Sequence, residues 1–155
     1  LAWGYKKRLQ TLETLRRMVY CLKGEIVYSH APLGEAFERI GKREKSVLGE
    51  LFMQAAERIS SRSGETFAKI WEQTIEKMEE NGKNFFLEKE DKDKLVSLGG
   101  QLGYLDAQMQ ERTLLLYLEQ LEYSISELRS EIREKCRMST ALGVMGSLFL
   151  VIVMV

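Results

Sequence analysis

The residue types that most often perform catalysis are few and scattered in this chain. His30 is the only histidine, and the two cysteines, Cys21 and Cys136, lie near opposite ends. A zinc site needs several such ligands at close spacing, and a catalytic histidine needs an acid to orient it and a nucleophile to activate. His30 instead stands just before Pro32, in a stretch typical of a loop, with neither partner nearby. We therefore expect no enzyme: no catalytic residue, no cofactor and no metal site.

The glycine-rich segment 99–103 is the other place to look for chemistry. A phosphate-binding loop ends in Gly-Lys-Ser/Thr, so that backbone amides and the lysine meet the phosphates. This segment reads Gly-Gly-Gln-Leu-Gly and lies between predicted helices rather than after a strand. We predict that Gly99 and Gly103 are structural, as turn or close-approach glycines. We expect no small-molecule substrate.

The overall charge argues against nucleic acid as a partner. Lys plus Arg and Asp plus Glu both number 23, so the net charge is zero, whereas nucleic-acid binding domains are usually strongly basic. Basic residues are nevertheless concentrated in residues 1–24, which hold six of them and one acid. That bias fits attraction to anionic lipid. The mixed-charge run 88–94 is most simply a solvated connection and helix start, although it also fits a partner-docking edge.

The C-terminal residues 138–155 contain no charged side chain. Eighteen such residues are just long enough to cross the hydrocarbon of a bilayer as a helix. A buried core helix is the alternative, but core helices rarely lack a polar face, and glycines such as Gly143 and Gly146 are common in membrane helices. We therefore predict a transmembrane helix over 138–155.

The N-terminus resembles a membrane–water boundary. Residues 1–5 include Trp3, and they are followed at once by Lys6, Lys7 and Arg8. Aromatic residues beside a basic cluster are typical of such boundaries. We predict that residues 1–5 are the stub of an N-terminal membrane helix; an ordinary exposed terminus is the alternative.

Basic residues flank both predicted membrane segments, which predicts their orientation. Lys135 and Arg137 precede the second segment as Lys6, Lys7 and Arg8 follow the first. Positively charged flanks stay in the cytoplasm. Residues 6–137 are therefore predicted to form a cytoplasmic domain, in which the cysteines are reduced thiols.

Hydrophobic spacing between the ends predicts an all-α, antiparallel multi-helix bundle. Apolar residues step by 3 and 4 in two long stripes, 12–26 and 114–132, which are complementary surfaces for packing. Phe85, Phe86 and Leu87 are expected to fill the core from a connection. The predicted helices run from 9 to the break at 29–32, from Pro32 to about 41, over 47–59, from beyond the turn at 60–64 to about 80, over 89–98, and from about Tyr104 into the membrane.

Three blocks of the sequence resemble the stage III sporulation protein AB family. The first is Glu25-Ile26-Val27-Tyr28 followed by Pro32-Leu33-Gly34-Glu35-Ala36. The second comprises Leu98-Gly99, Leu102-Gly103, Asp106 and Gln110. The third is Leu121-Glu122 with Lys135-Cys136-Arg137-Met138, leading into Leu142-Gly143. The likeness spans nearly the whole chain, and the order and spacing of the blocks make it fairly specific.

This resemblance implies a membrane protein of endospore-forming bacteria. Members are placed on the mother-cell side of the membrane around the forespore, have an N-terminal membrane helix, and are thought to join a trans-envelope channel complex. Their cytoplasmic domain is similar to helical domains of type II secretion and type IV pilus platform proteins. The implied partners are an ATPase of the stage III sporulation protein AA type, the other membrane subunits of the complex and the lipid bilayer.

The matched positions carry structural expectations of their own. Pro32 and Leu33 are expected to start a helix. Glu25, Tyr28, Asp106 and Gln110 are expected to form an internal polar network between the first helices and the last; four separate surface residues are the alternative.

Two other functions compete with a platform subunit. The heptad-like stripe of the last helix fits a membrane-anchored signalling or adaptor coiled coil with no export role. A pocket lined by Glu25, His30 and Asp106 would instead indicate an enzyme.

Overall fold

A computed structural model of the chain describes residues 2–61, 64–103 and 106–154. These residues form helices and connections without a strand, which confirms the predicted all-α class. The helices are α1 (Ala2–Val27), α2 (Leu33–Arg43), α3 (Val47–Ser60), α4 (Phe67–Glu80), α5 (Lys89–Leu102) and α6 (Ala107–Met154).

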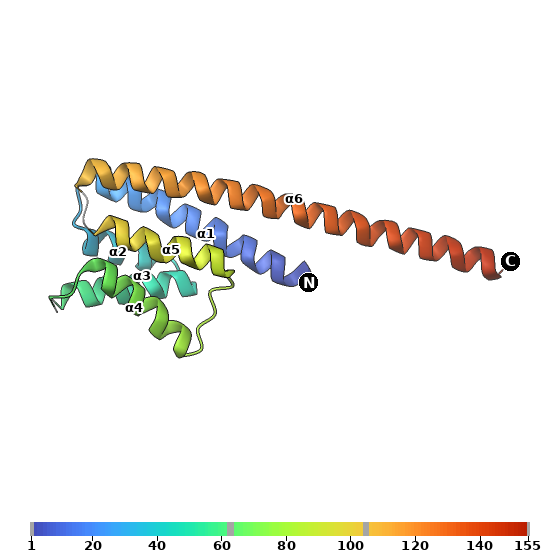
Figure 1. The fold of residues 1–155 in the computed structure, drawn as a ribbon, viewed down its shortest axis with the longest axis horizontal. Helices are drawn as coiled ribbons and strands as arrows, with labels where there is room; N and C mark the ends of the chain where they lie inside the picture. The colour runs from blue at the N-terminus through green and yellow to red at the C-terminus, as the bar shows by residue number, and fades with distance from the viewer. Residues whose placement is uncertain (1, 62–63, 104–105, 155) are drawn as a thin grey trace.

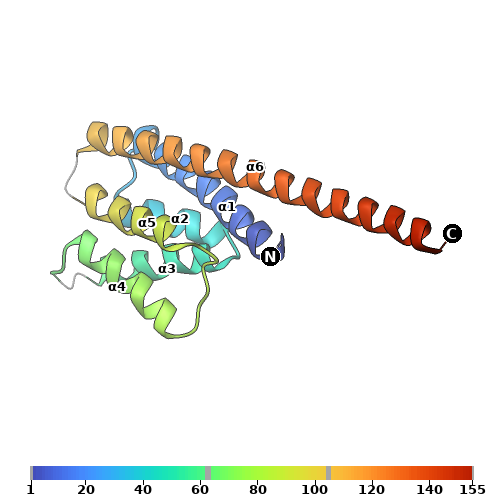
Figure 2. The same ribbon diagram turned by 45° about the vertical axis from the view of Figure 1, so that its right-hand side comes forward.

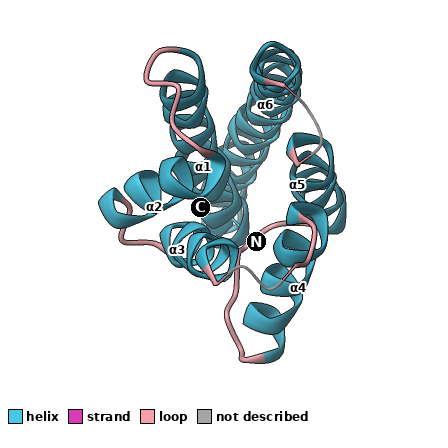
Figure 3. Cartoon of the chain, turned by 90° about the vertical axis from the view of Figure 1, so that its left-hand side faces the viewer, coloured by secondary structure: helices cyan, strands magenta, loops and turns pink. Residues whose placement is uncertain are grey.

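The long helices α1 and α6 lie side by side and antiparallel along one edge of the molecule (Figure 1). Viewed from one end, α2 and α3 lie below α1, and α4 and α5 lie below α6 (Figure 3). The N-terminus therefore lies beside the middle of α6, and the second part of α6 projects beyond the bundle (Figure 1).

The two apolar stripes predicted from the sequence face each other across the contact between α1 and α6. Five residues of each stripe are at most 9% exposed. They are Leu12, Leu15, Val19, Leu22 and Ile26 on α1, and Leu114, Leu118, Leu121, Ile125 and Leu128 on α6. Ion pairs at the rim fix the same register: Arg129 reaches Glu13 at 2.7 Å, and Arg16 reaches Glu122 at 3.1 Å. Burial of the stripes supplies most of the stabilisation, because exposed ion pairs contribute little.

An aromatic cluster joins the lower helices. The rings of Phe37, Phe52 and Phe67 all lie within 6 Å of the Trp71 ring, centroid to centroid. Trp71 is 1% exposed, and its indole nitrogen donates a 2.8 Å hydrogen bond to the Leu95 carbonyl of α5. A buried indole N–H needs such a partner, so this hydrogen bond fixes the position of α4 relative to α5.

Gly99 lies inside α5, and the predicted turn over 99–103 is wrong at this position. The physical reason is the close approach of Trp71: a β-carbon added to Gly99 would lie 2.0 Å from its ring. Gly103 follows the helix, where an added β-carbon would lie 3.0 Å from that of Phe67. Tyr104, at which we expected the last helix to begin, lies outside the described residues, and α6 begins at Ala107.

The connection between α4 and α5 differs from the prediction at one residue. Phe85 is 4% exposed within the core, and Leu87 packs against the core. Phe86 is not part of the core, so the expectation that all three residues fill it is wrong. The ring of Phe86 packs instead against that of Trp3 at the start of α1.

We predict that Gly99→Ala lowers the free energy of unfolding by about 3 kcal/mol, because its methyl group overlaps the immobilised Trp71 ring. Gly100→Ala is the matched control in the same helix, since nothing lies within 4 Å of its added carbon. That control should be neutral or stabilising by up to about 1 kcal/mol. Denaturant unfolding of the detergent-solubilised chain measures both, and equal stabilities would contradict the close approach.

Candidate membrane interface

The projecting part of α6 exposes a continuous apolar surface. Every large apolar side chain from Met138 to Met154 is more than half exposed. Within the described part of the chain, α6 is the one helix long and apolar enough to cross a membrane, with a window of mean hydropathy 1.8 and no buried residue. The alternative of a buried core helix is therefore wrong. Residues 138–154 span about 26 Å as a helix, close to the thickness of bilayer hydrocarbon of about 30 Å.

Two polar side chains in and beside this segment satisfy their hydrogen bonds within the helix. The Thr140 hydroxyl donates to the Cys136 carbonyl at 2.9 Å, and the Ser147 hydroxyl donates to the Gly143 carbonyl at 3.0 Å. Such back-bonding removes most of the cost of placing a hydroxyl in hydrocarbon. The segment therefore needs no partner for these groups.

The start of α1 meets α6 where α6 leaves the bundle. Lys135 donates to the Tyr5 hydroxyl at 2.5 Å, and its ammonium lies 3.9 Å from the centroid of the Tyr5 ring. Tyr5, Leu9 and Ile132 pack against the edge of the core. Residues 2–5 belong to α1 without a break, whereas Leu1 lies outside the described residues. The N-terminal membrane stub over 1–5 remains a prediction; the structure shows only that Tyr5 lies beside Lys135.

The side chain of Arg8, which was expected beside the membrane, points into the protein. Its guanidinium makes two hydrogen bonds to the Asp91 carboxylate, at 2.7 and 2.9 Å. The side chains of Arg8 and Asp91 are 16% and 4% exposed. The hydrogen bond to Asp91 raises the pKa of Arg8, which stays charged. Asp91 also accepts the Glu88 backbone N–H at 3.0 Å, so one carboxylate both starts α5 and ties it to α1.

Tyr117 of α6 lies near the same carboxylate and is 5% exposed. Burial, and to a lesser extent the charge of Asp91, raise the pKa of Tyr117 well above its usual range. The phenol therefore stays neutral, and the ion pair that Asp91 makes is with Arg8.

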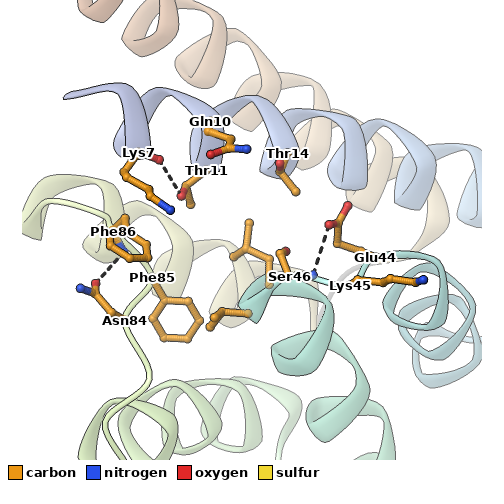
Figure 4. Close-up of a pocket in the computed structure, with 12 residues that line it drawn as sticks. Lys7, Gln10, Thr11, Thr14, Glu44, Lys45, Ser46, Asn84, Phe85 and Phe86 are labelled. Atoms are coloured by element: carbon orange, nitrogen blue, oxygen red, sulfur yellow. Dashed lines mark hydrogen bonds between the residues drawn. The ribbon is translucent and has the colours of Figure 1, made fainter. Parts of the chain in front are cut away.

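Phe86 packs against Trp3 beside this end of α1. The two rings meet edge to face at 6.3 Å, and the ammonium of Lys7 lies 5.2 Å from both centroids. Phe86 adopts a left-handed backbone with φ of 57°, which costs a non-glycine residue about 1 kcal/mol or more. The side chain of Asn84 accepts the Phe86 N–H at 2.8 Å and holds this turn (Figure 4).

The predicted polar network of Glu25, Tyr28, Asp106 and Gln110 is wrong. Glu25 instead pairs with Arg39 at 2.9 Å, and Tyr28 is 81% exposed. The Asp106 carboxylate caps α6 by accepting the Met109 N–H at 2.9 Å, and the Gln110 amide donates to the Leu102 carbonyl at 3.0 Å. Each group therefore has a separate local partner or, for Tyr28, faces water.

These positions nevertheless share one end of the bundle. The last turns of α1 and α5 and the first turn of α6 all lie at the end remote from the projecting part of α6 (Figure 1). Pro32 directly precedes α2, and Leu33 is its first residue and packs against the core, as helix-starting residues do. We call the connection 28–32 and the start of α6 the distal end.

No feature of the described residues resembles a reaction centre. A groove of about 360 Å³ runs between α1, the start of α3 and the α4–α5 connection (Figure 4). Hydroxyl, amide and lysine side chains line it beside Phe85 and Phe86. Among residues 2–61, 64–103 and 106–154 there is no group of three His, Cys, Asp or Glu that could hold a metal ion. Glu25 and Asp106 bind different partners, so the pocket that would have indicated an enzyme is not formed with them.

Comparison with known proteins assigns the whole chain to one family. Residues 1–155 match the family described as stage III sporulation protein AB. The chain belongs to the stage III sporulation protein AB family. A relative of that name from Bacillus subtilis (strain 168) is 26% identical over 150 residues, which cover 97% of this chain and 85% of the relative.

A solved structure titled stage III sporulation protein AB (SpoIIIAB) has the same fold. It superposes with a TM-score of 0.71 at 26% identity, covering 82% of this chain and 97% of the solved one. The family resemblance read from the sequence is thereby confirmed. The names of these relatives are those of sporulation proteins and not of enzymes.

Neither Asp91 nor Phe86 stood out in the sequence as part of this interface. Asp91 sits in the run 88–94, whose mixed charges indicate a solvated segment. A signal was nonetheless present: Asp91 lies four residues before Leu95 and seven before Leu98, on the buried face of α5. Its spacing from Glu88 is also that of a capping box.

We predict that Asp91→Ala lowers the free energy of unfolding by about 3 kcal/mol, because it leaves the Arg8 charge largely buried without a partner. The control Glu90→Ala removes a 75%-exposed carboxylate from the same turn and should cost less than about 0.5 kcal/mol. Denaturant unfolding of the solubilised chain separates the two, and equal losses would count against the buried pair.

Asp106→Ala should lower the free energy of unfolding by about 1 kcal/mol, the usual loss for an N-cap. Asp106→Ser keeps a capping oxygen and should recover most of that loss. Because Tyr28 is not connected to Asp106, Tyr28→Phe should leave stability unchanged and should be additive with Asp106→Ala. A free energy of unfolding of the double mutant that differs clearly from the sum of the two single effects would show that Tyr28 and Asp106 interact, against the structure.

Proposed function

We propose that this chain is a membrane-anchored platform subunit of the sporulation channel complex between mother cell and forespore. The observation that carries the proposal is that one helix, α6, forms a wall of the bundle and continues without a break into an exposed apolar segment. Membership of the stage III sporulation protein AB family supplies the sporulation context. The bundle has no catalytic role in this proposal; it holds and positions other proteins.

The cations support a cytoplasmic bundle on the mother-cell side of the membrane. Lys6 and Lys7 near the start of α1 lie at the same end of the bundle as Lys135 and Arg137 on α6, and positive residues at the boundary favour the cytoplasmic face. The distal end then points away from the bilayer into the cytoplasm. This orientation offers it to soluble partners, of which we propose a secretion-type ATPase like stage III sporulation protein AA.

The continuity of α6 supports a mechanical role. A partner that displaces the distal end moves a helix that also crosses the bilayer, where the other membrane subunits of the complex would be contacted. A free heptad stripe was the observation that favoured a signalling or adaptor coiled coil. That stripe is buried against α1, so the observation no longer favours the alternative.

Membrane insertion is tested by placing a charge within the apolar segment. Leu148→Arg, near the middle of 138–155, should disfavour insertion by about 2–3 kcal/mol and reduce the fraction of chain that resists alkaline extraction from membranes. Met138→Arg, at the boundary, should have little effect. Full extraction of the unmodified chain as a monomer, without detergent, would contradict the proposed anchoring.

Coupling to the ATPase is tested by photo-crosslinking in sporulating cells. A benzophenone amino acid at Tyr28, which is 81% exposed at the distal end, should yield an adduct with the ATPase. The same probe at Tyr123, which is 66% exposed on the side of α6, is the matched control and should not. The reverse pattern would place the ATPase on the side of the bundle. If probes at distal positions give no adduct with the ATPase, the proposed coupling is wrong.

A further inference from the structure

We propose that the α4–α5 connection is a second membrane contact, in which Phe86, together with Trp3 and Lys7, rests on the anionic surface of the bilayer that α6 spans. This inference rests on the proposed insertion of α6. The inference adds to the membrane-contacting residues a segment that is far from both chain ends in the sequence and has no long apolar stretch of its own.

The first argument is position. The α4–α5 connection lies below the first turns of α1, on the side of the bundle from which α6 projects (Figures 1 and 2). An open recess of about 480 Å³ separates the connection from α1 and is lined by Trp3, Gly4, Tyr5, Arg8, Phe86, Leu87 and Glu88. The same Tyr5 contacts Lys135 on α6, three residues before the uncharged segment begins. The recess is therefore continuous with the proposed membrane boundary.

The second argument is the chemistry of Trp3 and of the half-buried Phe86 and Lys7 beside it. Trp3 is 66% exposed, and its ring meets that of Phe86 edge to face. The ammonium of Lys7 lies over both rings, and an aromatic surface with a cation at its rim suits the headgroup region of a bilayer.

The third argument is the balance of charge around the recess. Within the described part of the chain, the ion pairs include neither Lys6 nor Lys7, nor Lys89 at the start of α5. Glu88, by contrast, has Arg8 at 3.9 Å. Cations outside ion pairs beside a membrane favour anionic lipid over zwitterionic lipid.

The fourth argument is the backbone of Phe86. Its left-handed conformation turns the ring away from Phe85, which alone enters the core. Strained backbone of this kind persists where the surroundings hold it and is common at binding sites. Here the Asn84 side chain holds it, and the consequence is a half-buried aromatic ring that lies against the exposed Trp3 instead of in the core.

The arrangement of the bundle makes the contact geometrically available. The other helices all lie to one side of the α1–α6 pair, so α6 is not central but at an edge (Figure 2). Membrane helices are tilted by about 20° on average. A tilt of α6 toward the side of the α4–α5 connection lowers that connection to the lipid surface, and contact there would fix the direction of the tilt.

The experiment measures the depth of single tryptophans in the full-length chain. The chain carries Trp3→Phe and is reconstituted in vesicles of equal parts phosphatidylglycerol and phosphatidylcholine, the latter brominated at shallow acyl carbons. Trp71 is 1% exposed in the core and contributes a constant background. Phe86→Trp reports the proposed contact, Tyr123→Trp reports the exposed side of the bundle, and Leu148→Trp reports the inserted helix.

We expect quenching by brominated lipid at position 86 to be at least about twice that at position 123, since interfacial aromatics reach the shallow acyl region. Adding Lys7→Glu and Lys89→Glu, or removing phosphatidylglycerol, should lower quenching at 86 and leave 148 unchanged. If the tryptophan at position 86 is quenched no more than the one at position 123, while the one at position 148 is quenched, α6 is inserted but the inferred contact is wrong. That result is expected if Phe86 is covered by a protein subunit in the complex instead of by lipid. Loss of quenching at 148 as well would overturn both this inference and the proposed anchoring. An unchanged thermal midpoint of the Phe86→Trp chain confirms that it is folded.

Discussion

The contact between α1 and α6 is the constraint on which the other features depend. Both helices present one apolar stripe, and each stripe is buried only if the helices run antiparallel in a single register. That register places Tyr5 against Lys135 and so sets the start of α1 level with the point where α6 leaves the bundle. Packing of leucine and isoleucine side chains thus defines both the distal end and the opposite end, from which the apolar segment of α6 projects.

The buried pair of Arg8 and Asp91 adds a second constraint at the end from which the apolar segment of α6 projects. Apolar packing is tolerant of small shifts, whereas two hydrogen bonds between a guanidinium and a carboxylate are directional. The pair ties α5 to α1 close to the place where the α4–α5 connection carries Phe86. A buried ion pair is weak evidence of net stability, and its value here lies in fixing the position of that connection.

Residues with a strong periodic signal were predictable, and residues whose role depends on a distant neighbour were not. Leu114, Leu118 and Leu121 follow a helical repeat that can be read without any structure, and so does the uncharged segment after Arg137. Gly99 was expected as a turn or close-approach glycine; the structure shows a close approach inside α5, and the sequence did not indicate that Trp71 is the neighbour. No local pattern links positions 71 and 99.

The candidate site was predictable only in part, for the same reason. Trp3, Lys6 and Lys7 were expected at a boundary from their order alone, whereas Arg8 differs from its neighbours because its helix face meets Asp91. The residues shared with the family suggested a network between Glu25 and Asp106, but each is satisfied within a few residues or by an adjacent helix. Similarity between sequences marked where these residues matter without indicating what they contact.

Because α6 runs without a break from Ala107 to Met154, the direction in which the bundle faces around the helix axis is fixed relative to the apolar segment. Each residue of an α-helix turns the chain by about 100°. One residue inserted between Ile132 and Met138 would therefore swing the whole bundle by more than a quarter turn around the anchor, whereas four inserted residues would nearly restore its facing and lift it by about 6 Å. The number of residues in this short stretch thus sets which way each side of the bundle faces relative to the apolar segment, a property that no single side chain specifies.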